Sequence, residues 1–175
     1  MKQTIGILSV LLVLALALAA CGPAATSDAL TTGALQNAEY QTEWTETGTV
    51  QLKDGEYRAP AAPGSASEIV VALTEYVADG ELDGQPAAAV ILYSSGGGSG
   101  TFYELHVMVE REGQPHDVAW TYLGDRVQIN SLSIQDDEIV VDMVTQGPDD
   151  PMCCPTQQVV RTYALQGEEL VQTSE

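Results

Sequence analysis

The chain has 175 residues, a formal net charge of −19 and 45% hydrophobic residues. Such an acidic balance repels polyanions, which argues against nucleic acid and anionic lipid headgroups as partners of the globular part. Apolar and polar residues alternate across most of the second half, so there is apolar surface to bury and a disordered chain is excluded.

The first twenty residues carry the pattern of an export signal. Lys2 precedes an apolar run over residues 5–20, which ends in Leu18-Ala19-Ala20-Cys21. The run is shorter than the roughly 20 residues of a membrane-spanning helix, and small residues before the cysteine are typical of a cleavage site. This arrangement resembles the lipobox of bacterial lipoproteins. The alternatives are a transmembrane anchor and an ordinary secretory signal, which would not require Cys21.

The lipobox resemblance implies that Cys21 becomes the first mature residue and carries acyl chains such as palmitate. The protein would then be extracytoplasmic and anchored to the membrane by lipid. The site would be the outer membrane of a diderm, since Gly22 is not a retention acid, or the outer leaflet of a monoderm membrane. Beyond residue 20 the chain has five Lys or Arg against 25 Asp or Glu, a balance of −20. This balance suits divalent cations, basic partners or a salty medium, or simply a soluble surface.

Composition divides the chain into a signal peptide over 1–20, the lipidated cysteine with a flexible linker over 21–34, and one acidic β-rich domain over 35–175. A short helix between residues 29 and 43 is the one helical segment that the pattern allows. Asp54-Gly55 separates two alternating runs and predicts a tight hairpin turn, because both positions of such a turn need positive φ.

Strand patterns fill the rest of the domain. Several turn signals between them are about 8 to 12 residues apart, the spacing of an antiparallel meander. The apolar phase slips within residues 127–134, which predicts a bulge near Ser131. We therefore expect a mainly β fold, an antiparallel meander or small sandwich of about seven to nine strands. The expected strands cover residues 48–52, 56–58, 69–73, 88–93, 101–110, 118–123, 127–134, 139–143 and 159–165.

An acidic segment offers a weak candidate cation site. Asp79, Glu81 and Asp83 stand at alternate positions before Gly84, as in the first half of a calcium loop. The segment over 79–92 also resembles single FG-GAP or VCBS-like units, in which an acidic loop runs into an apolar strand. That resemblance implies calcium, the one possible cofactor. Position 9 is Ala87 and position 12 is Val90, so a plain solvated acidic turn is the alternative.

Few other residues suggest chemistry. The glycine-rich segment over 94–100 lacks the Lys-Ser/Thr ending of a phosphate loop and predicts a flexible hairpin loop. His106 falls on the polar face of its strand and His116 follows a proline in a turn, so both are expected at the surface. The sequence shows no nucleophile–base pair, and we expect no enzymatic activity.

Cys153 and Cys154 stand side by side in a proline-rich segment over 147–156. Four interpretations stay open: a disulfide between the neighbours, reduced thiols with at least one packed in the core, a soft-metal site that includes Met152, or a disulfide to another molecule. The G-P-x-D-P-M-C-C-P-T run resembles a group of small bacterial envelope lipoproteins. Similar upstream turns, over 96–103 and 123–126, extend the resemblance to about residues 35–171. It implies an envelope location and no particular activity.

Two functional hypotheses follow from these patterns. The first is a non-catalytic binding or interaction module with an envelope protein as its partner. The alternative is redox or soft-metal handling at Cys153 and Cys154.

Overall fold

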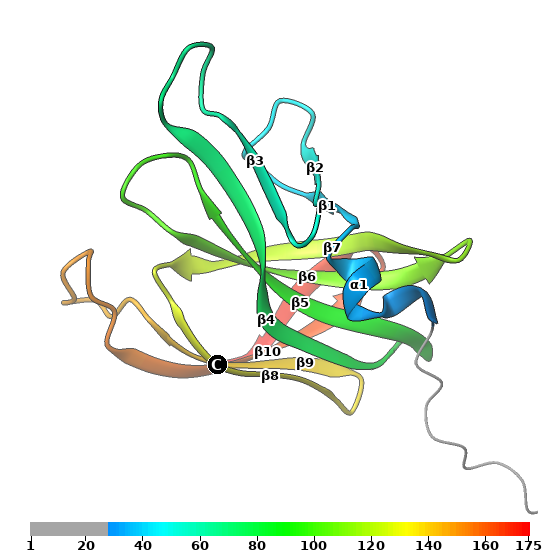
Figure 1. Ribbon diagram of the computed structural model, residues 1–175. Helices are drawn as coiled ribbons and strands as arrows, with labels where there is room; N and C mark the ends of the chain where they lie inside the picture. Colours follow the sequence, from blue (N-terminus) through cyan, green and yellow to red (C-terminus); the bar gives the residue numbers. More distant parts are fainter. Residues whose placement is uncertain (1–27) are drawn as a thin grey trace, which may run out of the picture.

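The computed structural model describes residues 28–175, and these residues form a mainly β structure with little helix. The prediction of a mainly antiparallel β fold is therefore confirmed. Eleven strands form, more than the seven to nine expected, and three antiparallel sheets contain them (Figure 1). The elements are η1 (Asp28–Leu30), α1 (Thr32–Leu35), β1 (Glu39–Gln41), β2 (Thr49–Gln51), β3 (Glu56–Pro60), β4 (Glu68–Leu82), β5 (Gln85–Ser95), β6 (Phe102–Arg111), β7 (Gln114–Asp125), β8 (Gln128–Gln135), β9 (Glu138–Thr145), β10 (Gln157–Gln166) and β11 (Glu169–Ser174).

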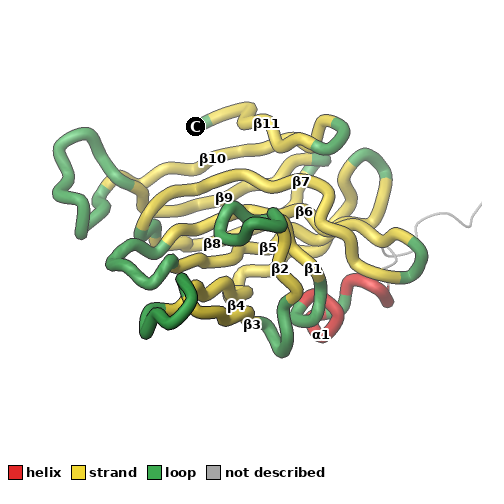
Figure 2. Tube along the Cα trace, turned by 90° about the horizontal axis from the view of Figure 1, so that it is seen from above, coloured by secondary structure: helices red, strands yellow, loops and turns green. Residues whose placement is uncertain are grey.

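Two consecutive meanders make the sandwich. Strands β3 to β7 form a five-stranded sheet in chain order, and β8 to β11 form a four-stranded sheet in the same way. β5 is the central strand of the first sheet, and its residues 87–92 are all buried. Such a run needs apolar residues on both faces, because a layer covers each side. In Figure 2 the strands of the two sheets overlap and run in nearly the same direction.

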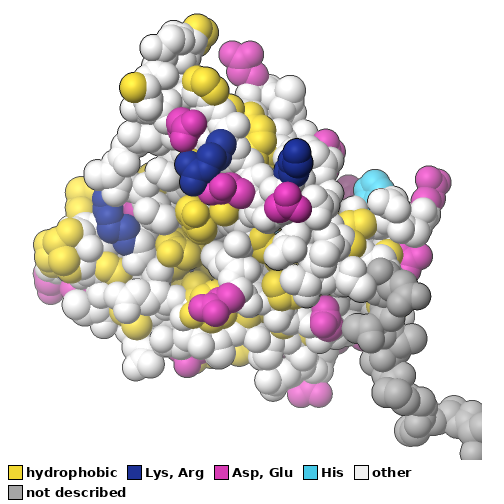
Figure 3. Space-filling model, in the orientation of Figure 1, with side chains coloured by type: hydrophobic (Ala, Val, Ile, Leu, Met, Phe, Trp, Pro, Cys, Tyr) yellow, Lys and Arg dark blue, Asp and Glu magenta, His cyan; other side chains and the backbone are white. Residues whose placement is uncertain are grey.

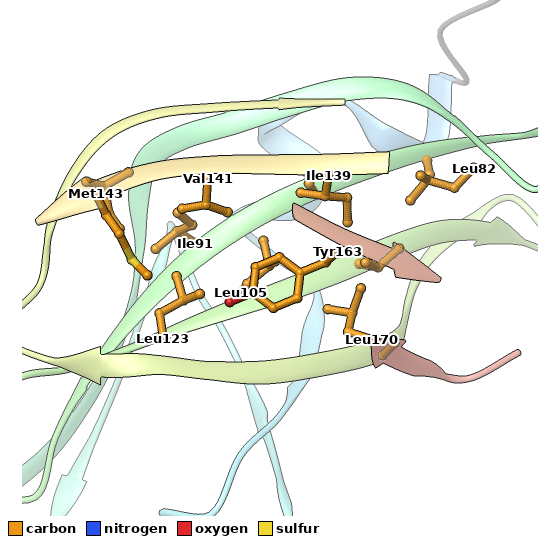
Figure 4. Close-up of a cluster of buried hydrophobic side chains, with 14 of the residues drawn as sticks. Leu82, Ile91, Leu105, Leu123, Ile139, Val141, Met143, Tyr163 and Leu170 are labelled. Atoms are coloured by element: carbon orange, nitrogen blue, oxygen red, sulfur yellow. The ribbon is translucent and has the colours of Figure 1, made fainter. Parts of the chain in front are cut away.

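The main core lies between the two meanders. β6 contributes Leu105 and Val107, both fully buried, and β9 contributes Ile139, Val141 and Met143 from the opposite sheet. In Figure 4 the side chain of Leu105 lies between the sheets with those of Ile139, Val141 and Met143 and with Tyr163 of β10. The period-2 alternation of both strands places these residues on one face, so the pattern predicted the layer correctly.

The N-terminal segment covers the other face of the five-stranded sheet. We call residues 28–52 the N-terminal cover; they contain η1, α1 and the β1–β2 pair. Thr31 caps α1 by accepting a hydrogen bond from the backbone N–H of Ala34, at 3.3 Å. Leu30, Leu35 and Tyr40 are buried in a second apolar cluster with residues of β4 to β6. The packed part of the chain therefore includes residues 28–34, which the sequence analysis placed in the linker.

The turns follow the predicted chemistry at some positions and not at others. Asp83-Gly84 and Asp136-Asp137 have positive φ at both positions and close two-residue hairpins. Asp54-Gly55 also has positive φ, and an isolated bridge between Lys53 and Glu56 closes the turn. The predicted hairpin is nevertheless wrong, because β2 pairs with β1 and β3 pairs with β4.

Two register irregularities lie in β8 and β4, strands of different sheets that contact each other. The bulge predicted near Ser131 is confirmed by a register shift between Ile129 and Ser131. A second irregularity, in β4 between Leu73 and Val77, had no sequence signal that we recognised. It places Tyr76 so that its hydroxyl donates to the Ile129 carbonyl at 2.7 Å, which ties β4 to β8.

Candidate functional site

A charged cluster lies beneath the N-terminal cover. We call Ser94, Glu104, His106 and Asp117, from three neighbouring strands, the buried cluster; each side chain is at most 4% exposed. His106 Nδ1 and Asp117 Oδ2 are 2.8 Å apart, and His106 Nε2 lies 3.8 Å from a Glu104 oxygen. The Ser94 hydroxyl donates to Glu104 at 3.1 Å. An imidazole thus sits between two carboxylates, and all three side chains are buried.

The cover contacts this cluster directly. The backbone N–H of Gln41 in β1 donates to Asp117 Oδ2 at 2.8 Å, and the Gln41 side chain donates to the Asp117 carbonyl. The ring of Tyr40 meets His106 edge-on, with centroids 5.5 Å apart. Trp120 stacks on the other side of the imidazole at 5.9 Å. One carboxylate oxygen therefore joins the histidine and the cover.

The electrostatics favour a charged imidazole. Burial opposes the imidazolium and by itself lowers the pKa of His106. The hydrogen bond to Asp117, the interaction with Glu104 and the charges of both carboxylates outweigh burial, so the pKa of His106 is raised above its ordinary value. Burial, aided by the charge of Asp117, raises the pKa of Tyr40 and keeps that phenol neutral.

The buried cluster has the residue types of an acid–base site, but a substrate could not reach its histidine. His106 is fully buried, so the expectation of a surface histidine is wrong for this residue. The sequence analysis assigned His106 to a polar strand face, but the N-terminal cover, which comes from far upstream in the chain, buries that face. His106 Nε2 and Asp117 Oδ1 have no hydrogen-bond partner among the described residues, which marks the cluster as incompletely satisfied.

Three loops meet at the other end of the sandwich. We call this the loop end: the β5–β6 loop, the β7–β8 connection and the β9–β10 loop. Arg126 joins all three, because its guanidinium pairs with Asp125 and donates to the carbonyls of Ser99 and Met152. Arg126 also donates its backbone N–H to the Thr101 carbonyl at 2.7 Å. A planar guanidinium with several fixed donors suits this bridging role.

Asp150 holds the β9–β10 loop in shape. Its carboxylate accepts from the backbone N–H groups of Gly147 and Thr156, at 2.8 and 2.6 Å, and from the Thr156 hydroxyl at 2.7 Å. The hydrogen bond from the Gly147 backbone is the main cause that lowers the pKa of Asp150. The segment is therefore a fixed loop although it lies at the surface.

The tip of this loop is apolar and exposed. Pro151, Met152, Cys153 and Cys154 are all exposed, and Met152 shows 80% of its surface. Cys153 and Cys154 are joined by a disulfide between neighbouring residues. We call residues 151–154 the knob. In Figure 3 apolar atoms protrude at the left edge, where Figure 1 shows the β9–β10 loop.

Glycines shape the neighbouring β5–β6 loop by packing. A Cβ on Gly96 would lie 2.6 Å from the Trp44 ring, and one on Gly100 would lie 2.5 Å from the Phe102 ring. Trp44 and Phe102 stack at 5.1 Å, so the glycine-rich segment is partly covered by aromatic rings. The predicted hairpin loop is present, and these close approaches restrict it.

The acidic segment over 79–84 builds a strand end and a turn. Asp79 and Glu81 lie in β4, Asp83 opens the hairpin turn, and all three are exposed. The Asp83 backbone N–H donates to Asp137 Oδ1 at 2.6 Å. Among residues 28–175, no three His, Cys, Asp or Glu side chains are grouped so that they could hold a metal ion. The Asp83-Gly84 pair thus forms the two-residue turn between β4 and β5.

The remaining predicted residues are placed as follows. Cys21 lies outside the described residues, and His116 is exposed at the start of β7, as expected. The sequence analysis missed Glu104 and Asp117. A usable signal was the face of β6 that carries Glu104 and His106, because it also carries Phe102 and Met108 and is therefore not uniformly polar.

Comparisons with known proteins do not assign the chain to a family. No family model, curated protein or solved structure matches the chain. Within residues 28–175, neither helix has the length and apolar character needed to cross a membrane.

Proposed function

We propose that this chain is a lipid-tethered extracytoplasmic binding module that contacts an envelope protein through the knob. The export pattern and Cys21 support the tether. The buried cluster supports a non-catalytic role, because its one histidine is fully buried and has no access for a substrate.

The observation that carries the proposal is a fixed apolar surface at the loop end. Exposed apolar residues are common singly, but four in succession on a loop held by Arg126 and Asp150 form a preorganised contact. α1, which contacts η1, lies at the end of the sandwich away from the β9–β10 loop (Figure 1). With Cys21 seven residues before Asp28, the tether would leave the knob facing outward.

Site-specific photo-crosslinking tests the knob. A photoreactive residue at Met152, in native membranes, should give a discrete protein adduct. The same residue at Gln135, exposed in the β8–β9 hairpin, should give none. Adducts from neither position, or equal adducts from both, would contradict a specific contact.

The tether is tested by Cys21→Ala. The variant should keep the fold of residues 28–175 and lose the acyl mass and the membrane association. Two or more acyl chains anchor a protein stably, so the loss should be nearly complete in fractionation. Acyl mass on the substituted protein would refute the lipobox interpretation.

Thiol–disulfide exchange is the second candidate, because the disulfide is exposed at the tip of the loop. A dithiol of a partner would attack one sulfur, pass two electrons and two protons to the pair, and leave as a disulfide. Mass spectrometry of the unfolded, unreduced chain should find a protein lighter by two hydrogen atoms than its reduced form, with neither Cys153 nor Cys154 open to alkylation. Two reactive thiols would end this candidate and leave the contact role in place.

A further inference from the structure

A polar hollow lies at the α1 end of the molecule, away from the knob. It has a volume of about 420 Å³ and lies between the end of α1, the β1–β2 pair and the start of β7. Six of its lining residues decide its chemistry, and they are Glu39, Gln41, Gln51, Gln114, His116 and Asp117. The N-terminal cover thus forms one wall and the edge of the five-stranded sheet the other.

The three glutamines present acceptors. Each uses its side-chain N–H group on a protein carbonyl: Gln41 on Asp117, Gln51 on Asn37, and Gln114 on Gly113. Their Oε1 atoms accept no hydrogen bond from any of the described residues. The side-chain oxygens can therefore accept from water or from a ligand in the hollow.

Two carboxylates add negative charge. Glu39 is exposed and makes no ion pair among the described residues, and no Lys or Arg lines the hollow. The Asp117 side chain is 3% exposed, and its Oδ1 has no partner within residues 28–175. Because this oxygen has almost no accessible surface, Asp117 acts on the hollow through its charge.

The buried cluster, next to the hollow, adds to its negative charge. Glu104 and Asp117 stand against one imidazolium at His106, so the buried cluster keeps a net negative charge when His106 is protonated. Asn37, Thr49 and His116 also line the hollow and carry side-chain donors. The three glutamine oxygens and the carboxylates of Glu39 and Asp117 stand against these donors, so the lining is mainly acceptor and negatively charged.

We propose that this hollow binds a small organic cation, an amine or guanidinium that supplies several N–H donors. Such a ligand would satisfy the glutamine oxygens and pair with Glu39, and charge-assisted hydrogen bonds of this kind are the strong ones. A metal ion fits less well, because no three ligating side chains are grouped among the described residues. The site is separate from the knob and does not depend on it.

Calorimetric titration with putrescine and with methylguanidinium tests the proposal at constant ionic strength. Saturable binding at one site per chain is expected, with glucose and sodium acetate giving none. Glu39→Gln should weaken binding about tenfold, the loss of one charge-assisted hydrogen bond. Glu81→Gln removes the same charge from an exposed position on β4 and should leave binding unchanged.

A third variant tests the acceptors without changing charge. Gln114→Leu lies at an exposed position and should weaken binding several-fold while thermal unfolding stays unchanged. No saturable binding of either cation would overturn the proposal. Equal weakening by Glu39→Gln and Glu81→Gln would also overturn it, because the attraction would then belong to the acidic surface as a whole. Binding of glucose alone would replace the cation with a neutral polyol.

Discussion

The two faces of the five-stranded sheet are made by the same strands but are stabilised differently. On the face toward β9, Leu105 and Val107 of β6 enter a layer of apolar side chains. On the opposite face, the next residues of the same strand, Glu104 and His106, lie in a charged cluster under the N-terminal cover. The first face depends on apolar burial alone, which is insensitive to pH. The second depends on the protonation of one imidazole.

The largest loss in the free energy of unfolding is expected for His106→Leu, which removes the positive charge from the second face. Removing the cation leaves the buried carboxylates of Glu104 and Asp117 without a counter-charge, and breaking a buried ion pair costs about 3–5 kcal/mol. Urea unfolding near pH 6 should show this loss in the free energy of unfolding. Adding Glu104→Gln to the variant should recover part of it. A loss as small as that of a surface substitution would show that the charges are not coupled.

Leu105→Ala is the matched change on the other face of β6. Leu105 is fully buried, and its truncation should lower the free energy of unfolding by about 2–5 kcal/mol through lost burial and a cavity. The same difference from wild type should be measured at about pH 6 and pH 9, because no titrating group in this layer changes charge there. A difference that varies with pH would mean that the two faces are not independent.

A smaller effect should appear when the pH is raised on the unaltered protein. The pKa of His106 is raised in the folded state, so its stabilising contribution is complete below its ordinary value of about 6.5 and is lost as the pH rises through the higher folded value. Hydrogen exchange, corrected for intrinsic rates, should show the Gln41 amide losing protection while the Val107 amide keeps it. Parallel loss at both amides would instead indicate global destabilisation.

The smallest change in overall stability is expected at the loop end. Asp150→Asn removes the charge that orders the β9–β10 loop, yet the global effect should stay within about 0.5 kcal/mol because the loop is at the surface. Limited proteolysis within residues 146–156 should become faster. Asp149→Asn is the control, since its exposed side chain makes no hydrogen bond to the described residues. Equal proteolysis of both variants would contradict the role of Asp150.

The sequence was sufficient to predict those features that depend on residues close together in the chain. Alternation in β6 and β9 predicted their apolar faces, and the phase slip in β8 predicted its bulge. Asp83-Gly84 turned the chain because positive φ is inexpensive for such a pair. Asp54-Gly55 has the same chemistry and similar φ angles, but the strands on either side pair elsewhere. A turn sets the direction of the chain and leaves the choice of strand partner to distant residues.

The buried cluster lay beyond prediction for the same reason. Glu104, His106 and Asp117 come within reach of one another through the register of β6 and β7. Their burial depends on Tyr40 and Gln41, more than sixty residues earlier in the chain. Periodicity reports which residues share a face, but not which segment covers that face.

The N-terminal cover also has a mechanical consequence. β1 and β2 pair with each other over only three residue pairs and are not part of the five-stranded sheet. A pull on residue 28 would act on this short pair and on the contacts at Asp117 before it loaded the longer ladders of β4 to β7. Release of residues 28–52 would lengthen the connection by at most about 80–90 Å, at roughly 3.3–3.6 Å per residue, while the sandwich stayed folded. The N-terminal cover, which shields His106, would then also act as an extensible link between residue 28 and the folded sandwich.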